Sequence, residues 1–315
     1  MVQKLKACII GASGFIGINL CLGLSRAGFD VTATIRFGGA EKNLRAVFKR
    51  ENVSVKLCYL DCLREGDLEQ FISENTSFDL AINATGYAVQ REQKDIELAK
   101  KINSDLPVLI AKAFDGHSER FVNLGSAYEY GKLGGCVTED MLCDPDTLYG
   151  ITKLEGTRKL LDSHLKASKL ICLRMFGIFG LYETPTKLFP ILYGIHTKKE
   201  NVTFSHGLQK VDYMHVNNVV DALTALTNRA FKTEKDIFNV GSGHPFTIRE
   251  IATKFSAIMA IKNEICWGKA TIRLSNEGTQ YANTKKIRNV CGWIPALDLD
   301  SGINLFINET RDRKI

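Results

Sequence analysis

The sequence of 315 residues lacks the features that mark several classes of protein. It has no run of about 18 apolar residues, as a membrane-spanning helix requires, and no apolar signal-peptide core at its start. Its Lys/Arg clusters are short and scattered, so the basic stripe of a nucleic-acid-binding protein is missing. Neither a CxxC pair nor a close histidine cluster occurs, and we therefore expect no metal site.

The composition instead describes an ordinary globular protein. Hydrophobic residues make up 45% and charged residues 24%, and the net charge is +6, which leaves ample material for the cores of two closely joined units. Several of the nine cysteines, among them Cys8, Cys58 and Cys172, lie within apolar runs, where a free thiol packs as a small hydrophobe. Free thiols persist in a reducing compartment, so we expect a cytoplasmic protein.

Short apolar runs alternate with amphipathic segments through the first two thirds of the chain. The expected strands are Ala7–Ile10, Val31–Ile35, Val55–Tyr59, Leu80–Asn83, Phe121–Leu124 and Leu170–Arg174. The expected helices include Phe15–Ala27, Asp67–Ser73, Asp95–Phe114 and Tyr149–Lys166. This alternation predicts an α/β fold with a doubly wound parallel sheet, which binds ligands at the carboxyl ends of its strands.

The regular alternation stops after Arg174. Residues 176–214 are richer in Gly, Pro, Tyr and His, and we expect them to be loop-rich. A helix over Val216–Ala230 and a strand over Ile237–Val240 are expected to follow, and the remainder mixes helices and short strands. The pattern predicts a second, smaller α/β lobe that grows out of the first unit by insertion and extension.

Three glycines follow the first expected strand and open the first expected helix. The first permits a tight turn, the second lets the backbone approach a pyrophosphate, and the third lets the helix pack closely on the strand. A glycine-rich turn without a ligand is the alternative, but the strand–helix context favours a dinucleotide cofactor on the free N–H groups of the helix. The expected contacts here are Gly11, Ser13, Gly14, Phe15, Ile16 and Gly17.

The end of the second expected strand should select the cofactor, because an acidic residue there binds the ribose hydroxyls of NAD. No carboxylate stands at that end, and Asp30 precedes the strand. Arg36 is placed to bind the 2′-phosphate of NADP, although an arginine stacked on the adenine or left in solvent would give the same sequence. We expect NADP(H) to be preferred and NAD(H) to be possible.

Two further segments are expected to contact the cofactor. Asp61, after the third strand and beside Cys62, would accept a hydrogen bond from the adenine amino group, or would instead cap the following helix. The turn after the fourth strand, with Ala84, Thr85 and Gly86, would bring its backbone against the centre of the cofactor.

The catalytic candidates are Ser126, Tyr149 and Lys153. Tyr149 and Lys153 lie one helical turn apart on the same face, so Lys153 can lower the pKa of the phenol and bind the nicotinamide ribose. Ser126, just after the fifth strand, can hold a reacting carbonyl oxygen beside Tyr149. A surface Tyr–Lys pair and a buried turn serine would show the same letters, and the upstream glycine motif favours the catalytic interpretation.

Over nearly its full length, the chain resembles the extended short-chain dehydrogenase/reductase family of nucleotide-sugar epimerases, dehydratases and 4-reductases. The segments that carry the resemblance are GASGFIG at 11–17, GSAYEYG at 125–131, YGITK at 149–153, LRMFGIFG at 173–180, QKVDYMHVNNVVDAL at 209–223, FNVGSGHPFTIREIA at 238–252 and CGWIPALDLDSGI at 291–303. The resemblance implies a Ser126–Tyr149–Lys153 triad and a nucleotide-sugar substrate bound by the second lobe. It also implies a homodimer in which Asp95–Phe114 and Tyr149–Lys166 pair across a two-fold axis.

We therefore expect a Rossmann-type NAD(P)-binding domain of residues 1–175 with about 215–244, and a nucleotide-sugar-binding lobe of residues 176–214 and 245–315. Family dehydratases carry an Asp–Glu pair directly after the catalytic hydroxyl residue, where this chain has Ala127 and Tyr128, so dehydration is not expected.

The substrate contacts are also expected to depart from the family pattern. Gly177 stands where many members have Asn, and Val211 stands where an arginine helps to hold the diphosphate. Lys210 or Arg273 would then take the charge, although Arg273 equally fits an ordinary surface position. The expected substrate contacts are Tyr87, Ser126, Tyr128, Phe176, Gly177, Lys187, Gln209, Lys210 and Arg273.

We expect an NADPH-dependent reductase of a 4-keto-6-deoxy nucleotide-sugar, in deoxysugar biosynthesis for surface polysaccharide. Hydride would pass to the ketone carbon, Tyr149 would protonate the oxygen, and Ser126 would orient it. The alternative is an NAD-dependent nucleotide-sugar 4-epimerase, in which the same triad oxidises and re-reduces the sugar. A more remote alternative is a catalytically idle cofactor-binding scaffold, against which the complete triad argues.

Overall fold

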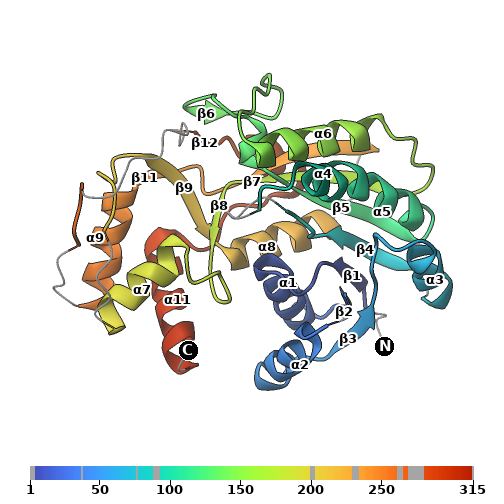
Figure 1. Cartoon of the computed structure of the whole chain (residues 1–315), viewed down its shortest axis with the longest axis horizontal. Helices are drawn as coiled ribbons and strands as arrows, with labels where there is room; N and C mark the ends of the chain where they lie inside the picture. The colour runs from blue at the N-terminus through green and yellow to red at the C-terminus, as the bar shows by residue number, and fades with distance from the viewer. Residues whose placement is uncertain are drawn as a thin grey trace.

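The computed structural model describes residues 4–36, 38–75, 77–87, 93–198, 203–228, 234–260, 265–268 and 280–313. A seven-stranded parallel sheet forms its centre, in the order β10-β7-β5-β4-β1-β2-β3 (Figure 1). The strands are β1 (Lys6–Ile10), β2 (Asp30–Ile35), β3 (Val55–Tyr59), β4 (Phe78–Asn83), β5 (Ser118–Ser126), β7 (Lys169–Met175) and β10 (Lys235–Val240). The predicted doubly wound parallel sheet is confirmed, and its order reverses at β1, where ligands bind beyond the carboxyl ends of the strands.

Both faces of the sheet are buried, which explains why its strands read as nearly continuous apolar runs. On β1, Ala7 and Ile9 belong to one apolar cluster, whereas Cys8 and Ile10 belong to the cluster on the opposite face. The first cluster is covered by α1 (Phe15–Arg26), α2 (Ala40–Arg50), α8 (Val216–Thr227) and α10 (Lys285–Cys291). The second is covered by α3 (Asp67–Glu74), α5 (Leu106–Phe114) and α6 (Leu148–Asp162).

The expected continuous helix over Asp95–Phe114 is wrong in its middle. The structure has α4 (Ile96–Lys100), a π-helical turn at Lys101–Asp105, and then α5. Pro107 has no N–H to donate to the carbonyl four residues before it, that of Asn103, so the regular ladder fails there. The wider turn also lets α6 approach closely, since a Cβ on Gly156 would lie 2.1 Å from the Asn103 carbonyl oxygen.

The predicted helix over Tyr149–Lys166 ends earlier than expected. In the structure α6 ends at Asp162, because the backbone N–H groups of Lys166, Ala167 and Ser168 donate to the Asp115 carboxylate at 2.7–3.0 Å. The predicted helix Val216–Ala230 is α8, which ends at Thr227, whereas Ala230 lies outside the described residues.

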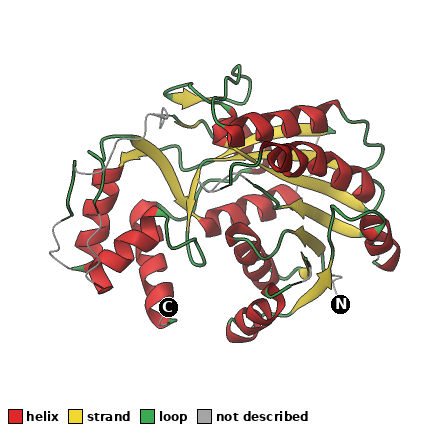
Figure 2. Ribbon diagram, viewed as in Figure 1, coloured by secondary structure: helices red, strands yellow, loops and turns green. Residues whose placement is uncertain are grey.

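A smaller lobe lies beside the sheet and contains β-strands and helices of its own (Figure 2). The expectation that residues 176–214 are loop-rich is wrong in part. Weak strand signals and Pro190 in the first turn of a helix conceal regular structure there, which packs around the stacked rings of Phe179 and Phe189, 3.7 Å apart. The elements of the lobe are β8 (Gly177–Phe179), α7 (Leu188–Lys198), β9 (Lys210–His215), β11 (Pro245–Thr247), α9 (Ile248–Met259) and α11 (Leu299–Asp312).

Asp212 of β9 joins three segments that lie far apart in the sequence. Its carboxylate accepts hydrogen bonds from the backbone N–H groups of Ser242, Gly243 and Ala282 at 2.8–3.0 Å, and from the Ser242 hydroxyl. Ala282 ends β12 (Tyr281–Ala282), which pairs with β6 (Cys136–Val137). The carboxylate therefore connects the lobe to the outer strand pair above the large sheet.

The predicted boundaries between the two domains stay a prediction. One detail bears on them: Ile287, Cys291 and Trp293 pack in the apolar cluster of the large sheet rather than in that of the lobe. Within the described ranges, every helix is too short or too polar to cross a bilayer.

Candidate active site

The turn between β1 and α1 has the geometry that a dinucleotide pyrophosphate requires. Gly11 has a positive φ of 87°, and a Cβ on Gly17 would lie 2.4 Å from the Gly11 carbonyl oxygen, so both positions need glycine. Gly14 is the N-cap of α1 and has no side chain to bind the first N–H groups of the helix, which leaves them for an anion. The residues present here therefore fit a dinucleotide cofactor.

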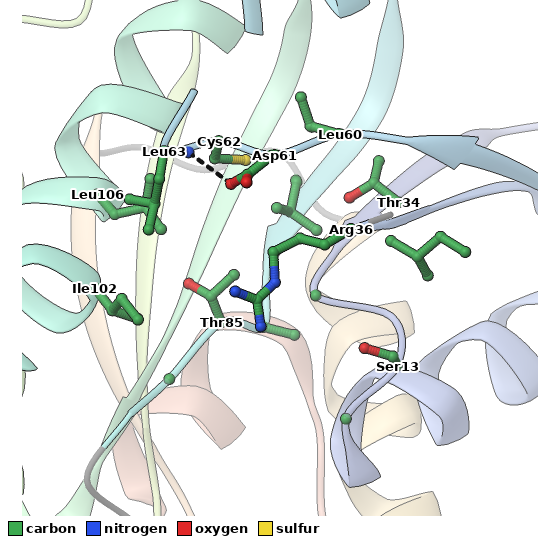
Figure 3. Close-up of a pocket in the computed structure, with 16 residues that line it drawn as sticks. Ser13, Thr34, Arg36, Leu60, Asp61, Cys62, Leu63, Thr85, Ile102 and Leu106 are labelled. Atoms are coloured by element: carbon green, nitrogen blue, oxygen red, sulfur yellow. Dashed lines mark hydrogen bonds between the residues drawn. The ribbon is translucent and has the colours of Figure 1, made fainter. Parts of the chain in front are cut away.

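A cavity of about 220 Å³ lies beside this turn, at the carboxyl ends of β1, β2, β3 and β4. Arg36 extends into it from the end of β2, and Asp61 faces it from the turn after β3 (Figure 3). The Asp61 carboxylate accepts a hydrogen bond from the backbone N–H of Leu63 at 3.1 Å, so it caps its own turn as well as facing the cavity. Lining residues predicted from the sequence are Gly11, Ser13, Gly14, Arg36, Asp61, Cys62, Ala84, Thr85 and Gly86.

The apolar walls of this cavity were not predicted. Leu60, Leu63, Ile102 and Leu106 line it, the last two from the π-helical turn and the start of α5. A flat aromatic group such as an adenine fits between apolar walls of this kind. Nothing in the local sequence distinguishes these four residues from ordinary core positions, because they meet only in the folded protein.

An adjoining recess of about 470 Å³ adds a second cation that was not predicted. Arg36 and Arg64 line it together with Ser13, Asp61 and Asp67. Arg64 lies 3.5 Å from the Asp67 carboxylate. The recess thus brings two guanidinium groups and two carboxylates to the end of β2. Because both signs of charge are present, the recess is compatible with the ribose hydroxyls of NAD and with the 2′-phosphate of NADP.

A larger cavity of about 1170 Å³ begins at Gly14 and contains the predicted triad. Predicted residues that line it are Gly14, Phe15, Ile16, Ala84, Thr85, Gly86, Ser126, Tyr128, Tyr149, Lys153, Phe176, Gly177 and Lys187. The two cavities share Gly14 and the 84–86 turn, so a single dinucleotide can extend from one into the other.

The structure brings Ser126, Tyr149 and Lys153 together. Ser126 and Tyr149 line the same cavity, and the Ser126 side chain acts on the phenol as a hydrogen-bonding partner that lowers its pKa. The Lys153 ammonium lies 5.9 Å from the centre of the Tyr149 ring and donates to the carbonyl oxygens of Leu124 at 2.9 Å and Thr85 at 3.2 Å. Thr147 is the N-cap of α6, its hydroxyl accepting from the Gly150 N–H, and so places Tyr149 in the first turn.

Burial has opposite effects on the two titrating members of the triad. Desolvation lowers the pKa of Lys153 to about 8, because the ammonium loses its water. Desolvation also raises the pKa of Tyr149 well above its ordinary value, and the hydrogen bond with Ser126 only partly offsets this. Burial is the largest influence on the Tyr149 pKa here, and the lowering of that pKa by Lys153 stays a prediction.

Two asparagines support the cavity and were missed in the sequence. Asn83 donates to Asn123 at 2.8 Å and accepts from Thr85, which orders the 84–86 turn. Asn103, in the π-helical turn, accepts from the backbone N–H of Tyr87 at 3.0 Å and donates to its carbonyl oxygen at 2.9 Å. The backbone of Tyr87 is thereby fixed, but this residue is not part of the cavity lining.

The remaining predicted substrate contacts are divided. Gln209 and Lys210, at the start of β9, are not part of the lining of these cavities in the described chain, and Arg273 lies outside the described residues. Glu183 does line the large cavity and was not predicted. Its Oε2 is buried and has no hydrogen-bond partner within the described part of the chain, and burial raises its pKa to about 8.

Residues 7–241, well over half of the chain, match the model described as the NAD dependent epimerase/dehydratase family. The chain belongs to this family. The predicted membership of the extended short-chain dehydrogenase/reductase group is thereby confirmed.

Relatives within the epimerase/dehydratase family are distant but extend along nearly the whole chain. A bifunctional UDP-glucose 4-epimerase and UDP-xylose 4-epimerase 3 of Arabidopsis thaliana is 27% identical, covering 90% of this chain and 89% of the relative. CDP-abequose synthase of Salmonella muenchen is 19% identical, covering 96% and 97%. The solved structure of UDP-glucose 4-epimerase from Bifidobacterium longum with NAD+ and UDP superposes with a TM-score of 0.86 at 21% identity, covering 98% of this chain and 99% of that one.

This member of the epimerase/dehydratase family has no carboxyl group in the two positions after Ser126. Ala127 is buried, whereas Tyr128 is exposed and its ring meets that of Tyr149 edge-on at 5.8 Å. The next residue, Glu129, is a carboxylate, but it points away from solvent and is completely buried. The cavity thus presents hydroxyl groups around Tyr149.

Proposed function

We propose that the protein is an NAD-dependent 4-epimerase of a nucleotide-sugar. The observation that carries the proposal is the Ser126–Tyr149–Lys153 constellation in a cavity continuous with the glycine turn, without a carboxyl pair after Ser126. The family match and the 4-epimerases among the relatives support it and favour it over the reductase expected from the sequence.

The residues of the chain would transfer the proton of the C4 hydroxyl group and hold the sugar in position. Bound NAD supplies the hydride acceptor and donor. Tyr149, hydrogen-bonded to Ser126, would take the proton from the C4 hydroxyl during oxidation and return it during reduction, while the Ser126 hydroxyl holds the oxygen in place. The cationic form of Lys153 would favour the phenolate.

The proposed reaction requires a cavity in which the substrate can present both of its faces. An epimerase removes hydride from one face of C4 and restores it to the other, so the sugar ring has to turn between the two transfers. The large cavity, at about 1170 Å³, would have to hold the nicotinamide end of the cofactor as well as the sugar, because Gly14 and the 84–86 turn also line it. Ala127 and Tyr128 stand where the family dehydratases carry their Asp–Glu pair, so the described site lacks that particular pair for the elimination of water.

The proposal is tested by incubating the purified protein with UDP-glucose, UDP-xylose or UDP-glucuronic acid and separating the sugars by chromatography. We expect one of them to be converted to an equilibrium mixture with its 4-epimer, with no net change in cofactor absorbance. If NADPH is instead consumed in proportion to the reduction of a 4-keto-6-deoxy nucleotide-sugar, the reductase is correct and the epimerase is wrong.

The reductase stays a second candidate because of Arg36. This residue replaces the carboxylate that would bind the ribose of NAD, and it lines the cavity beside Ser13. CDP-abequose synthase, to which the chain is 19% identical, also supports the reductase, because its name does not describe an epimerase. NADP(H) would then be the cofactor, and surface-polysaccharide deoxysugars the products.

Arg36→Ala separates these two roles of the arginine. If the guanidinium binds a 2′-phosphate, its loss should weaken NADP(H) binding by about 1.5–3 kcal/mol, the value of a hydrogen bond to a charged group, and leave NAD(H) almost unaffected. Calorimetric titration of both cofactors gives the comparison, with Arg64→Ala as the matched change across the same recess. Equal losses for both cofactors would instead place Arg36 on the adenine.

We also propose that the protein is a cytoplasmic homodimer built on α4, α5 and α6. These helices carry exposed apolar side chains; Leu109 is 47% accessible, whereas Ile96 and Ile151 also line the large cavity. Sedimentation at micromolar concentration should give a dimer, and Leu109→Glu, at a position that does not line the large cavity, should give a monomer. Leu142→Glu, at a still more exposed position away from these helices, should leave the dimer intact; a wild-type monomer refutes the proposal.

A further inference from the structure

Glu129 is a charged residue with no exposure to solvent, and it lies directly beneath the catalytic serine. It ends the short 3₁₀ turn Ala127–Glu129, which follows β5. One carboxylate oxygen accepts a hydrogen bond from the backbone N–H of Ser126 at 2.9 Å, and the other accepts from Arg174 Nε at 3.0 Å. Because Ser126 Oγ accepts in turn from the Tyr128 N–H at 3.2 Å, the turn forms a closed capping box around Ser126.

The surrounding structure leaves the carboxylate little freedom. A Cβ on Gly125 would lie 2.5 Å from Glu129 Oε1 and 3.1 Å from the Leu173 carbonyl oxygen, so glycine is required for the carboxylate to reach the Ser126 N–H. Arg174 is fixed as well: its guanidinium lies 4.6 Å from the centre of the Tyr130 ring and donates to the Glu139 carbonyl oxygen. A buried ion pair adds little to stability by itself, which raises the question of what this one does.

We propose that Glu129 is a positioning residue, whose carboxylate, anchored by Arg174, fixes the backbone of Ser126 so that the serine hydroxyl meets that of Tyr149. The inference rests on the proposed epimerase function only in one respect, namely which reaction the positioned serine serves. The contacts among Glu129, Ser126 and Arg174 are independent of it. No other carboxylate in the described chain contacts Ser126.

The same carboxylate acts on the triad through its charge. The negative charge of Glu129 raises the pKa of Lys153, against the larger lowering by desolvation, and also raises the pKa of Tyr149. Lys153 is charged below its pKa of about 8, so removal of the Glu129 charge moves the loss of the ammonium to lower pH. The charged and titratable groups that face Glu129 are Arg174, Lys153, Tyr128, Tyr130, Tyr149, Cys143 and Cys172.

The experiment compares Glu129→Gln with Glu139→Gln. Both residues are largely buried carboxyls near Arg174, but Glu139 accepts its hydrogen bond from the Asn239 N–H and does not touch Ser126. We expect Glu129→Gln to lower kcat roughly tenfold or more with little change in KM, and to shift the alkaline limb of the kcat profile to lower pH by about one unit. Glu139→Gln should leave both unchanged.

A direct titration keeps this test separate from the proposed reaction. The Lys153 side chain is followed by ¹⁵N NMR in the cofactor-free protein, with Lys153→Arg for assignment. Its midpoint should fall in Glu129→Gln and not in Glu139→Gln, whatever substrate the enzyme uses. If the wild type has no epimerase activity, only the proposed function is refuted. If the Lys153 midpoint is unchanged in Glu129→Gln, and Glu129→Gln and Glu139→Gln lose kcat equally, the positioning role is refuted.

Arg174 becomes an uncompensated buried charge in Glu129→Gln, which can prevent folding. The double variant Glu129→Gln/Arg174→Met removes both charges and retains much of the volume. It should fold, and it should show the same lowered Lys153 midpoint and the same loss of kcat. A folded double variant with wild-type kcat and midpoint would contradict the proposal.

Discussion

Tyr149→Phe should lower kcat by about 10²–10⁴-fold, because it removes the only atom that transfers the proton while the ring stays in place. KM and NAD binding should change little, since Lys153 and the glycine turn are untouched. Steady-state kinetics and calorimetric titration of NAD provide the measurement.

Tyr128→Phe is the matched control for this substitution. The Tyr128 ring meets that of Tyr149 edge-on, so both changes remove one hydroxyl from the same wall of the cavity. If Tyr149 is the acid–base residue, Tyr128→Phe should retain kcat to within about tenfold. Similar losses in the two variants would assign the hydroxyl groups to substrate binding rather than to proton transfer.

Gly17→Ala and Gly14→Ala should separate the two roles of the glycine turn. The added methyl of Gly17→Ala would lie 2.4 Å from the Gly11 carbonyl oxygen, so either the helix or the turn must move. We expect a loss of about 1–3 kcal/mol in the free energy of unfolding, the usual cost of overpacking, accompanied by loss of NAD binding. Chemical denaturation of the cofactor-free protein measures the first effect.

In Gly14→Ala, the methyl would meet only the Gly11 carbonyl oxygen, at an ordinary 3.7 Å. Its φ of −79° suits alanine, so the fold should retain its stability. NAD affinity should nevertheless fall at least about tenfold, because the methyl enters the space where the backbone approaches the pyrophosphate. Wild-type affinity in Gly14→Ala would show that the cofactor does not approach this turn.

Local motifs explain why so much of the site could be predicted. Gly11, Gly14 and Gly17 combine a turn, a ligand contact and a packing constraint within one strand–helix junction, so their spacing alone carries the information. Tyr149 and Lys153 share one helical turn. The identification of Ser126 depended on its place at the end of a strand, which the apolar run before it made recognisable.

The residues that were missed act through contacts distant in the sequence. Glu129 and Arg174 are 45 positions apart and meet only because Gly125 of β5 pairs with Arg174 of β7. Asn103 has meaning only once Pro107 has disturbed its helix. Three-residue strands such as β8 carry too few residues for a periodic signal, and so the lobe was predicted least well.

Cofactor choice was the other point at which sequence reasoning and the comparisons diverged. A missing carboxylate and a present arginine at the end of β2 favoured NADP, whereas the Bifidobacterium longum structure with the same fold holds NAD+. The recess around Arg36 also holds Arg64, Asp61 and Asp67, which contribute charges of both signs, so the preference for NADP stays a prediction.

The Asp212 carboxylate has a consequence for how the molecule opens. Three backbone amides, those of Ser242, Gly243 and Ala282, share it as their acceptor, so a movement of this one carboxylate releases all three at once. The turn after β10 and the strand pair β6–β12 should therefore become accessible in one step, as a single cooperative unit.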